Sequence, residues 1–386
     1  MKIRNLPRLG ASLLCAALAL ATLNACDPPA AQATGALALV LGAHANAPAP
    51  GFTPTTLAAV DEAVSKGSYL AMVVESSQPQ VVASGWLKPS GANSQSQHDA
   101  RVRLQDAVLA QVAGSRAEAP ESNPLLAISL AARAVAAEPG PRSMVIVDSM
   151  LQTTAPMSFL HEGMLSAAPA EVVAYLTNLG ELPDLKGFRV ILSGVGDTAP
   201  PQLPLPSVQR NALVTLWTTV LQHAGAIDVE VDQTPLTGAS LHHVPAVSPV
   251  PSEQLAGWPP GCPSQIVITD GQVGFLPDLA TFRDPSAAEA LLKKVAASFG
   301  RCGWKTVHLT GTTADWGTAR GRQLLSMARA NAVAAELRRM HVPSGAITTS
   351  GLGSSFAGFI PDRTPKGVLI PDKAEQNRKV TLTFGK

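Results

Sequence analysis

The sequence is poor in aromatic residues and in net charge, and each shortage excludes a class of protein. Aromatic side chains make up 4% of the 386 residues, so the core must consist mainly of Ala, Val, Leu and Ile. Basic and acidic residues nearly balance, at 29 and 28, so the chain has no basic surface of the kind that binds nucleic acid. Hydrophobic residues reach 46%, which is typical of a globular chain and excludes a disordered one. The length is sufficient for two domains of ordinary size.

Patterns that would indicate catalysis or a metal site are also missing. The four cysteines form no Cys-x-x-Cys motif, so nothing indicates redox catalysis. Ser149 lacks the Gly-x-Ser-x-Gly surroundings of a hydrolase nucleophile. Asp148 ends the apolar run MVIVD but is not part of the Asp-x-Ser-x-Ser pattern that binds a divalent ion in von Willebrand A-like domains. The sequence therefore predicts no catalytic residue, no cofactor and no metal site, and Asp148 is expected to cap a loop.

The N-terminus carries a charged segment followed by an apolar one. Lys2, Arg4 and Arg8 precede an apolar stretch over residues 9–23, which is the arrangement of a secretory signal peptide. The stretch is short for a membrane-spanning helix, which needs about 20 residues. An ordinary cleaved signal peptide and an uncleaved membrane anchor are the alternatives to a lipoprotein signal peptide.

The end of this segment, Leu23-Asn24-Ala25-Cys26, resembles the lipobox of bacterial lipoproteins. In that family the cysteine receives a diacylglycerol, the signal is cut just before it, and the new N-terminus is acylated by a fatty acid such as palmitate. The resemblance implies a signal peptide over residues 1–25, lipidation of Cys26, and a tether over residues 26–35. The mature chain would be held by lipid on the extracytoplasmic side of a membrane.

An exported chain meets an oxidising compartment, which bears on the two remaining cysteines. Cys262 and Cys302 are expected to form a disulfide there. Two free buried thiols are the alternative.

Residues 36–235 alternate apolar, strand-like runs with helical patterns. This alternation predicts an α/β layered domain with a mainly parallel sheet, either Rossmann-like or von Willebrand A-like. The loops after its parallel strands should gather at one end of the sheet, where such folds bind ligands. Asn46, Asp148 and Asp197 are the polar residues expected there. Residues 236–262, rich in Pro, Ser and Gly, predict a linker in which residues 241–247 could add an edge strand.

A second series of strands and helices begins near Gln265. A long helix is predicted over residues 318–340, and the residues that share its apolar face are Ser326, Arg329, Ala330, Val333 and Leu337. An arginine on a buried face must be paired or must reach a pocket, and its planar fork suits a carboxylate. An internal ion pair that only orients the helix is the alternative.

The motifs of this second region occur in the order found in OmpA-like peptidoglycan-binding domains, which the region resembles. The segments that carry the resemblance are VGFLPDLATF (273–282), LTGTTADWG (309–317), LSMARANAV (325–333), ITTSGLG (347–353) and NRKV (377–380). The resemblance implies that residues 263–386 form a βαβαβ sandwich that binds the diaminopimelate of the peptidoglycan stem peptide.

In that family an arginine binds the carboxylate of diaminopimelate and an aspartate binds its ammonium group. Arg329 matches the arginine, whereas Ala314 occupies the aspartate position and Asp315 follows one residue later. Thr312 replaces the family histidine. Asp315 either replaces the aspartate or caps the following helix. Asn377 and Arg378 match the C-terminal motif and would support the binding loop or pack the last strand.

The sequence as a whole predicts a lipid-anchored envelope protein that binds peptidoglycan non-covalently and links a membrane to the cell wall. Its partners would be the membrane and the diaminopimelate stem peptide, with no nucleic acid. The main alternative is an extracytoplasmic sensing or ligand-binding protein whose N-terminal domain carries the function. A wall-acting hydrolase is the third class, but no catalytic residues support it.

Overall fold

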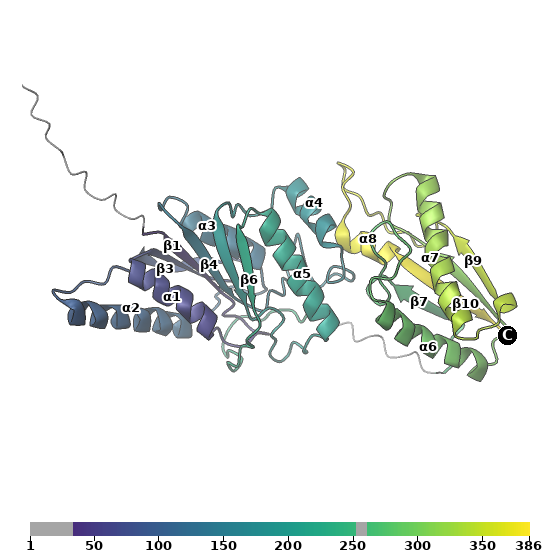
Figure 1. Cartoon of the computed structure of the whole chain (residues 1–386), viewed down its shortest axis with the longest axis horizontal. Coiled ribbons are helices and arrows are strands. Elements are labelled where there is room, and N and C mark those ends of the chain that lie inside the picture. The colour runs from purple at the N-terminus through teal and green to yellow at the C-terminus, as the bar shows by residue number, and fades with distance from the viewer. Residues whose placement is uncertain (1–33, 252–260) are drawn as a thin grey trace, which may run out of the picture. The chain divides into compact units, whose positions relative to one another are not determined.

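The computed structural model describes residues 34–251 and 261–386, which contain two separate β-sheets with their helices (Figure 1). Residues 1–33 lie outside the described part, and with them the predicted signal peptide, nearly all of the tether, and Cys26. Within the described residues, no helix combines the length and the apolar character needed to cross a membrane.

The first domain contains a six-stranded sheet. Its strands are β1 (Ala36–Leu41), β2 (Tyr69–Val74), β3 (Gln80–Trp86), β4 (Arg142–Val147), β5 (Phe188–Ser193) and β6 (Asp228–Asp232). They lie in the order β3-β2-β1-β4-β5-β6, and all neighbouring pairs are parallel except β2 with β3. Every residue of the central strand β1 is buried, which explains why its sequence is apolar throughout instead of alternating.

Helices cover both faces of this sheet and form the predicted layered α/β fold. One core contains Ala36, Ala38 and Val40 of β1 together with α3 (Pro124–Ala134), α4 (Pro169–Leu179) and α5 (Ser207–His223). The intervening leucines of β1 belong to a second core with α1 (Pro54–Lys66) and α2 (Ser94–Gly114). Successive side chains of a strand point to opposite faces, so one strand serves both layers.

The segment before the second domain is bound to the first. The side-chain amide of Asn46 donates to the carbonyl of Val247 at 2.8 Å, and Gln202 exchanges hydrogen bonds with the backbone of Val250. The predicted edge strand at 241–247 is wrong, because only Ser240 forms a single bridge, with Pro48. Prolines at 245, 249 and 251 cannot donate to a strand ladder, so side chains hold this segment instead.

The second domain contains a four-stranded mixed sheet in the order β7-β10-β8-β9, with β8 and β9 parallel and both other pairs antiparallel. One core joins the sheet to α6 and α7. The elements of the domain are β7 (Gln265–Thr269), α6 (Pro285–Arg301), β8 (Thr306–Gly311), α7 (Ala319–Arg339), β9 (Ile347–Gly351), α8 (Pro371–Asn377) and β10 (Lys379–Gly385).

Two local elements differ from what the sequence pattern indicates. Residues 272–275 have a pattern typical of a strand but form a turn, because the Asp270 carboxylate accepts the Phe275 N–H at 3.2 Å and closes the loop. The short helix α8 was not anticipated. It begins at Pro371, where the fixed φ of proline favours the first turn of a helix.

The predicted disulfide is confirmed. Cys262 and Cys302 are bonded across a separation of 40 residues, with their Cα atoms 5.5 Å apart. The bond joins the segment before β7 to the residue that follows α6. It therefore closes the loop that contains the first strand and the first helix of the second domain.

Removal of this bond should destabilise the second domain. Closure of a 40-residue loop lowers the entropy of the unfolded chain, so the double variant C262S/C302S should lose roughly 2–4 kcal/mol of unfolding free energy. Calorimetry of the full chain with and without reductant measures this effect. The reductant should reproduce the loss in the wild type and leave the double variant unchanged, and equal melting of all four samples would contradict the prediction.

Candidate functional site

Arg329 lies on α7, and glycines of the sheet hold this helix unusually close. A Cβ atom on Gly311 of β8 would lie 2.0 Å from the carbonyl oxygen of Ser326, and one on Gly351 of β9 would lie 2.3 Å from the backbone nitrogen of Met327. Side chains are therefore excluded at both positions, and the helix backbone rests directly on the strands. This contact lies one turn of helix before Arg329.

Spacing along α7 places Arg329 as predicted. The buried residues of the helix are Ser326, Arg329, Ala330, Val333, Ala334 and Leu337. Thr318 caps the start of the helix by accepting the backbone N–H of Gly321 at 3.0 Å. Asp315 is thus not the helix cap, which corrects one of the two roles expected for it.

The guanidinium of Arg329 is hydrogen-bonded through its Nε atom, whereas its two Nη atoms are free to bind a ligand. Its Nε donates to the carbonyl of Leu279 at 3.1 Å, and its Cζ lies 5.0 Å from the ring centre of Phe275. Among the described residues, neither Nη atom has a hydrogen-bond partner. Arg329 lines a cleft, so the bidentate side of its fork is available to a ligand.

Burial lowers the pKa of Arg329, and the nearby carboxylate of Asp270 partly offsets this effect. The group remains charged, because an arginine does not lose its proton in proteins. The internal ion pair considered for Arg329 is not formed within the described residues. A buried cation without an ion-pair partner is costly, and an anionic ligand would compensate it.

Two aspartates near Arg329 were missed by the sequence reasoning. Asp270 follows β7 directly, is buried, and pairs with Arg283 at 3.2 Å. Asp278 is exposed and lines the same cleft. Its negative charge acts to raise the pKa of Arg329. Its backbone has a φ of 54°, a left-handed conformation that aspartate tolerates. Nothing in the local sequence indicates that this loop reaches Arg329, because the contact depends on the tertiary fold.

Asp315 is occupied by two arginines of its own domain. Its Oδ1 lies 3.0 Å from Arg322 Nη1, and its Oδ2 lies 3.2 Å from Arg363 Nε. Its backbone N–H donates to Asp362 at 3.0 Å. The adjacent Ala314, at the position of the family aspartate, is buried in a small apolar cluster. The carboxylate of Asp315 therefore fixes a loop at the edge of the cleft.

Thr312 and Asn377 hold loops together from inside the domain. The Thr312 hydroxyl donates to the carbonyl of Asn377 at 2.7 Å. The fully buried Asn377 side chain donates to Ile360 O and Asp362 Oδ2 and accepts the Ile360 N–H. Neither side chain is among those that line the cleft around Arg329. Arg378 does line it, with its Nη1 3.6 Å from Glu375 Oε2.

Comparison with known proteins relates the second domain to a protein family. Residues 275–366 match the model of the OmpA family, and no curated protein matches the chain. Among solved structures, the periplasmic domain of Helicobacter pylori MotB is similar at 14% identity and a TM-score of 0.27, covering 32% of this chain and 75% of that one.

Two further solved structures are similar to the chain at a comparable level. The peptidoglycan-associated lipoprotein from Burkholderia pseudomallei shares 22% identity at a TM-score of 0.25, covering 29% of this chain and 88% of that one. The cell wall anchor of the T6SS from Pseudomonas aeruginosa shares 22% identity at a TM-score of 0.26, covering 32% and 81%. The family match and the architecture described above together identify the C-terminal part of this chain as an OmpA-like domain.

Proposed function

We propose that the OmpA-like domain binds the diaminopimelate of peptidoglycan without covalent chemistry, and that a lipid on Cys26 attaches the other end of the chain to a membrane. The observation that carries the wall-binding half is the guanidinium of Arg329, buried and charged with both Nη atoms open to a cleft. A carboxylate is the ligand that this fork fits best, and diaminopimelate carries one at its free end.

The ammonium group of diaminopimelate needs a negative partner as well. Asp315 is already paired with two arginines, so we assign it to the support of the loop. Asp278 is the exposed carboxylate that shares the cleft with Arg329. Arg329 would bind the carboxylate of the zwitterion and Asp278 its ammonium group. Asp278 would thus supply the negative charge that is missing at Ala314.

Replacement of Arg329 by lysine should weaken wall binding even though the positive charge is kept. R329K keeps the charge but removes the fork, so a loss of about tenfold or more in affinity is expected from one charged hydrogen bond. Co-sedimentation of the full chain carrying C26S with diaminopimelate-type peptidoglycan measures this. R338A, at the exposed end of the same helix, is the control and should pellet like the wild type. Binding by R329K at wild-type strength would refute the role of the fork.

A pair of aspartate variants separates the two candidate acidic groups. D278N should reduce pelleting, because the ligand ammonium loses its carboxylate, whereas D315N should bind nearly as well as the wild type. The same co-sedimentation assay compares them, with circular dichroism as a check on folding. If D315N abolishes binding and D278N does not, Asp315 is the ammonium ligand and our assignment is wrong.

The lipid anchor is tested separately at Cys26. In a bacterial host that processes lipoproteins, C26S should release the chain from the membrane fraction and should prevent incorporation of a palmitate analogue. Fractionation and labelling measure both effects. A C26S chain that stays in the membrane fraction would instead indicate an uncleaved anchor.

A further inference from the structure

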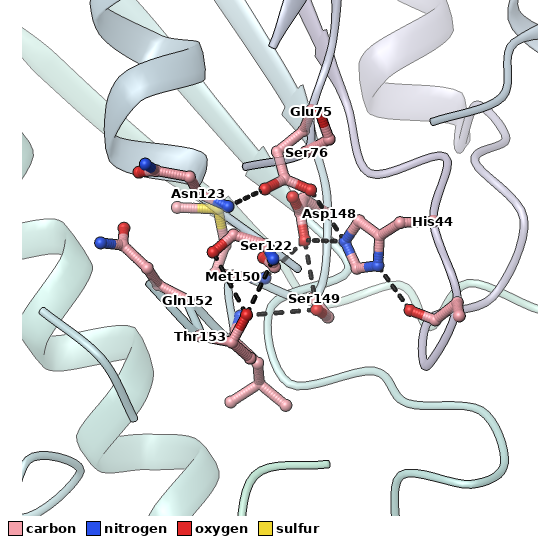
Figure 2. Close-up of polar contacts among 12 residues, drawn as sticks. His44, Glu75, Ser76, Ser122, Asn123, Asp148, Ser149, Met150, Gln152 and Thr153 are labelled. Carbon is pink, nitrogen blue, oxygen red and sulfur yellow. Dashed lines mark hydrogen bonds and ion pairs between the residues drawn. The ribbon is translucent and has the colours of Figure 1, made fainter. Parts of the chain in front are cut away.

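Three ionisable residues of the first domain meet at the carboxyl end of its sheet (Figure 2). Glu75 directly follows β2, Asp148 directly follows β4, and His44 lies three residues beyond β1. The strand order places β2, β1 and β4 side by side, so three segments distant in sequence converge on one point. This is the edge of a parallel sheet at which α/β domains bind ligands.

The three side chains are buried and face one another. His44 Nε2 lies 3.1 Å from Glu75 Oε2 and 3.5 Å from Asp148 Oδ1, and the side chains are 2%, 0% and 0% exposed. Apart from these contacts with each other, His44 Nε2 and Glu75 Oε2 have no hydrogen-bond partner among the described residues, and Asp148 Oδ2 has none there at all. Unpartnered polar atoms at such depth are rare in folded proteins and require an explanation.

The hydrogen bond of the other ring nitrogen of His44, Nδ1, indicates which nitrogen carries the proton. Nδ1 lies 2.5 Å from the carbonyl oxygen of Ala45, and since a carbonyl can only accept, Nδ1 carries the ring proton. In the neutral ring, Nε2 then presents a lone pair toward two carboxylates. Three buried electron-pair donors in contact with one another favour a cation among them.

Hydrogen bonds from outside the cluster also hold both carboxylates in place. Glu75 Oε1 accepts the N–H of Asn123, and Asp148 Oδ1 accepts the N–H of Met150 at 2.8 Å and the hydroxyl of Ser149 at 3.2 Å. Gly42 leaves room for this arrangement, because a Cβ atom there would lie 2.7 Å from the Asp148 Cγ. Such outer contacts, including a histidine N–H on a backbone carbonyl, are those that orient metal ligands.

We propose that His44, Glu75 and Asp148 bind one divalent transition-metal ion of the zinc class at the sheet edge of the first domain. A neutral imidazole and two carboxylates carry two negative charges, which a divalent ion balances. Ligand atoms about 2.0–2.1 Å from a tetrahedral zinc lie about 3.3 Å from each other, close to the two separations found here. The nitrogen ligand favours zinc-class ions over Mg²⁺ and Ca²⁺, which prefer oxygen alone. Three protein ligands leave a fourth position open.

A proton on His44 is the alternative to a metal ion between the three side chains. A proton on the ring balances only one of the two carboxylates, so the other would have to take up a proton of its own. A divalent ion balances both at once, and for this reason we favour the metal.

Metal titration of the full chain, with C15S and C26S to remove free thiols, distinguishes the two occupants. After treatment with a chelator, the protein should bind one Zn²⁺ per chain by calorimetry and mass spectrometry, and its melting temperature should rise. Co²⁺ in place of Zn²⁺ should give the visible absorption bands of a low-coordinate site. E75Q and D148N should each lose the bound metal and the metal-dependent rise in melting temperature.

Matched controls keep the result specific. The variant H242Q/H243Q, which removes the adjacent histidine pair, should bind Zn²⁺ like the wild type. Circular dichroism tests whether E75Q and D148N are folded, and their peptidoglycan pelleting should be unchanged, because it depends on the other domain. A wild-type chain that binds no Zn²⁺ or Co²⁺ stoichiometrically overturns the proposal, as does equal binding by E75Q and D148N.

Discussion

The direct backbone contact between α7 and the strands β8 and β9 is the constraint on which the binding cleft depends. Gly311 and Gly351 leave no space for a side chain, so the helix cannot shift outward without losing its packing on the sheet. Arg329 follows this contact by one turn and is therefore held at a fixed depth. Phe275 and the carbonyl of Leu279 then restrict the guanidinium itself. A fork fixed in this way loses little entropy when it binds a carboxylate.

A second set of contacts keeps the loops around this helix in place. Asp362 accepts hydrogen bonds from the backbone of Asp315 and from the side chain of Asn377, which links segments from three parts of the domain. Thr312 adds a bond to the backbone at Asn377. The family-like residues of this domain thus divide into two arginines that line the cleft, Arg329 and Arg378, and a network that supports its loops. Similar motif positions do not imply similar contacts with a ligand.

The sequence was sufficient for most elements of both domains but for only part of the site. Long apolar runs such as 36–41 identified the central strands, and helical spacing placed Arg329 on the buried face of its helix. Short patterns failed where a side chain competes with the backbone, as Asp270 does at Phe275. Asp278, His44 and Glu75 were missed because their neighbours come from distant segments. For His44 and Glu75 there was a usable signal, since each lies close behind a predicted parallel strand.

The disulfide has a consequence for how the second domain responds to pulling. β7 is an edge strand, paired only with β10, so a force on the chain at residue 265 would separate it one hydrogen bond at a time. Cys262 precedes this strand and is bonded to Cys302, close to the central strand β8. Tension that arrives from the first domain therefore passes through a covalent bond toward the middle of the sheet. This edge strand is thereby shielded from mechanical peeling.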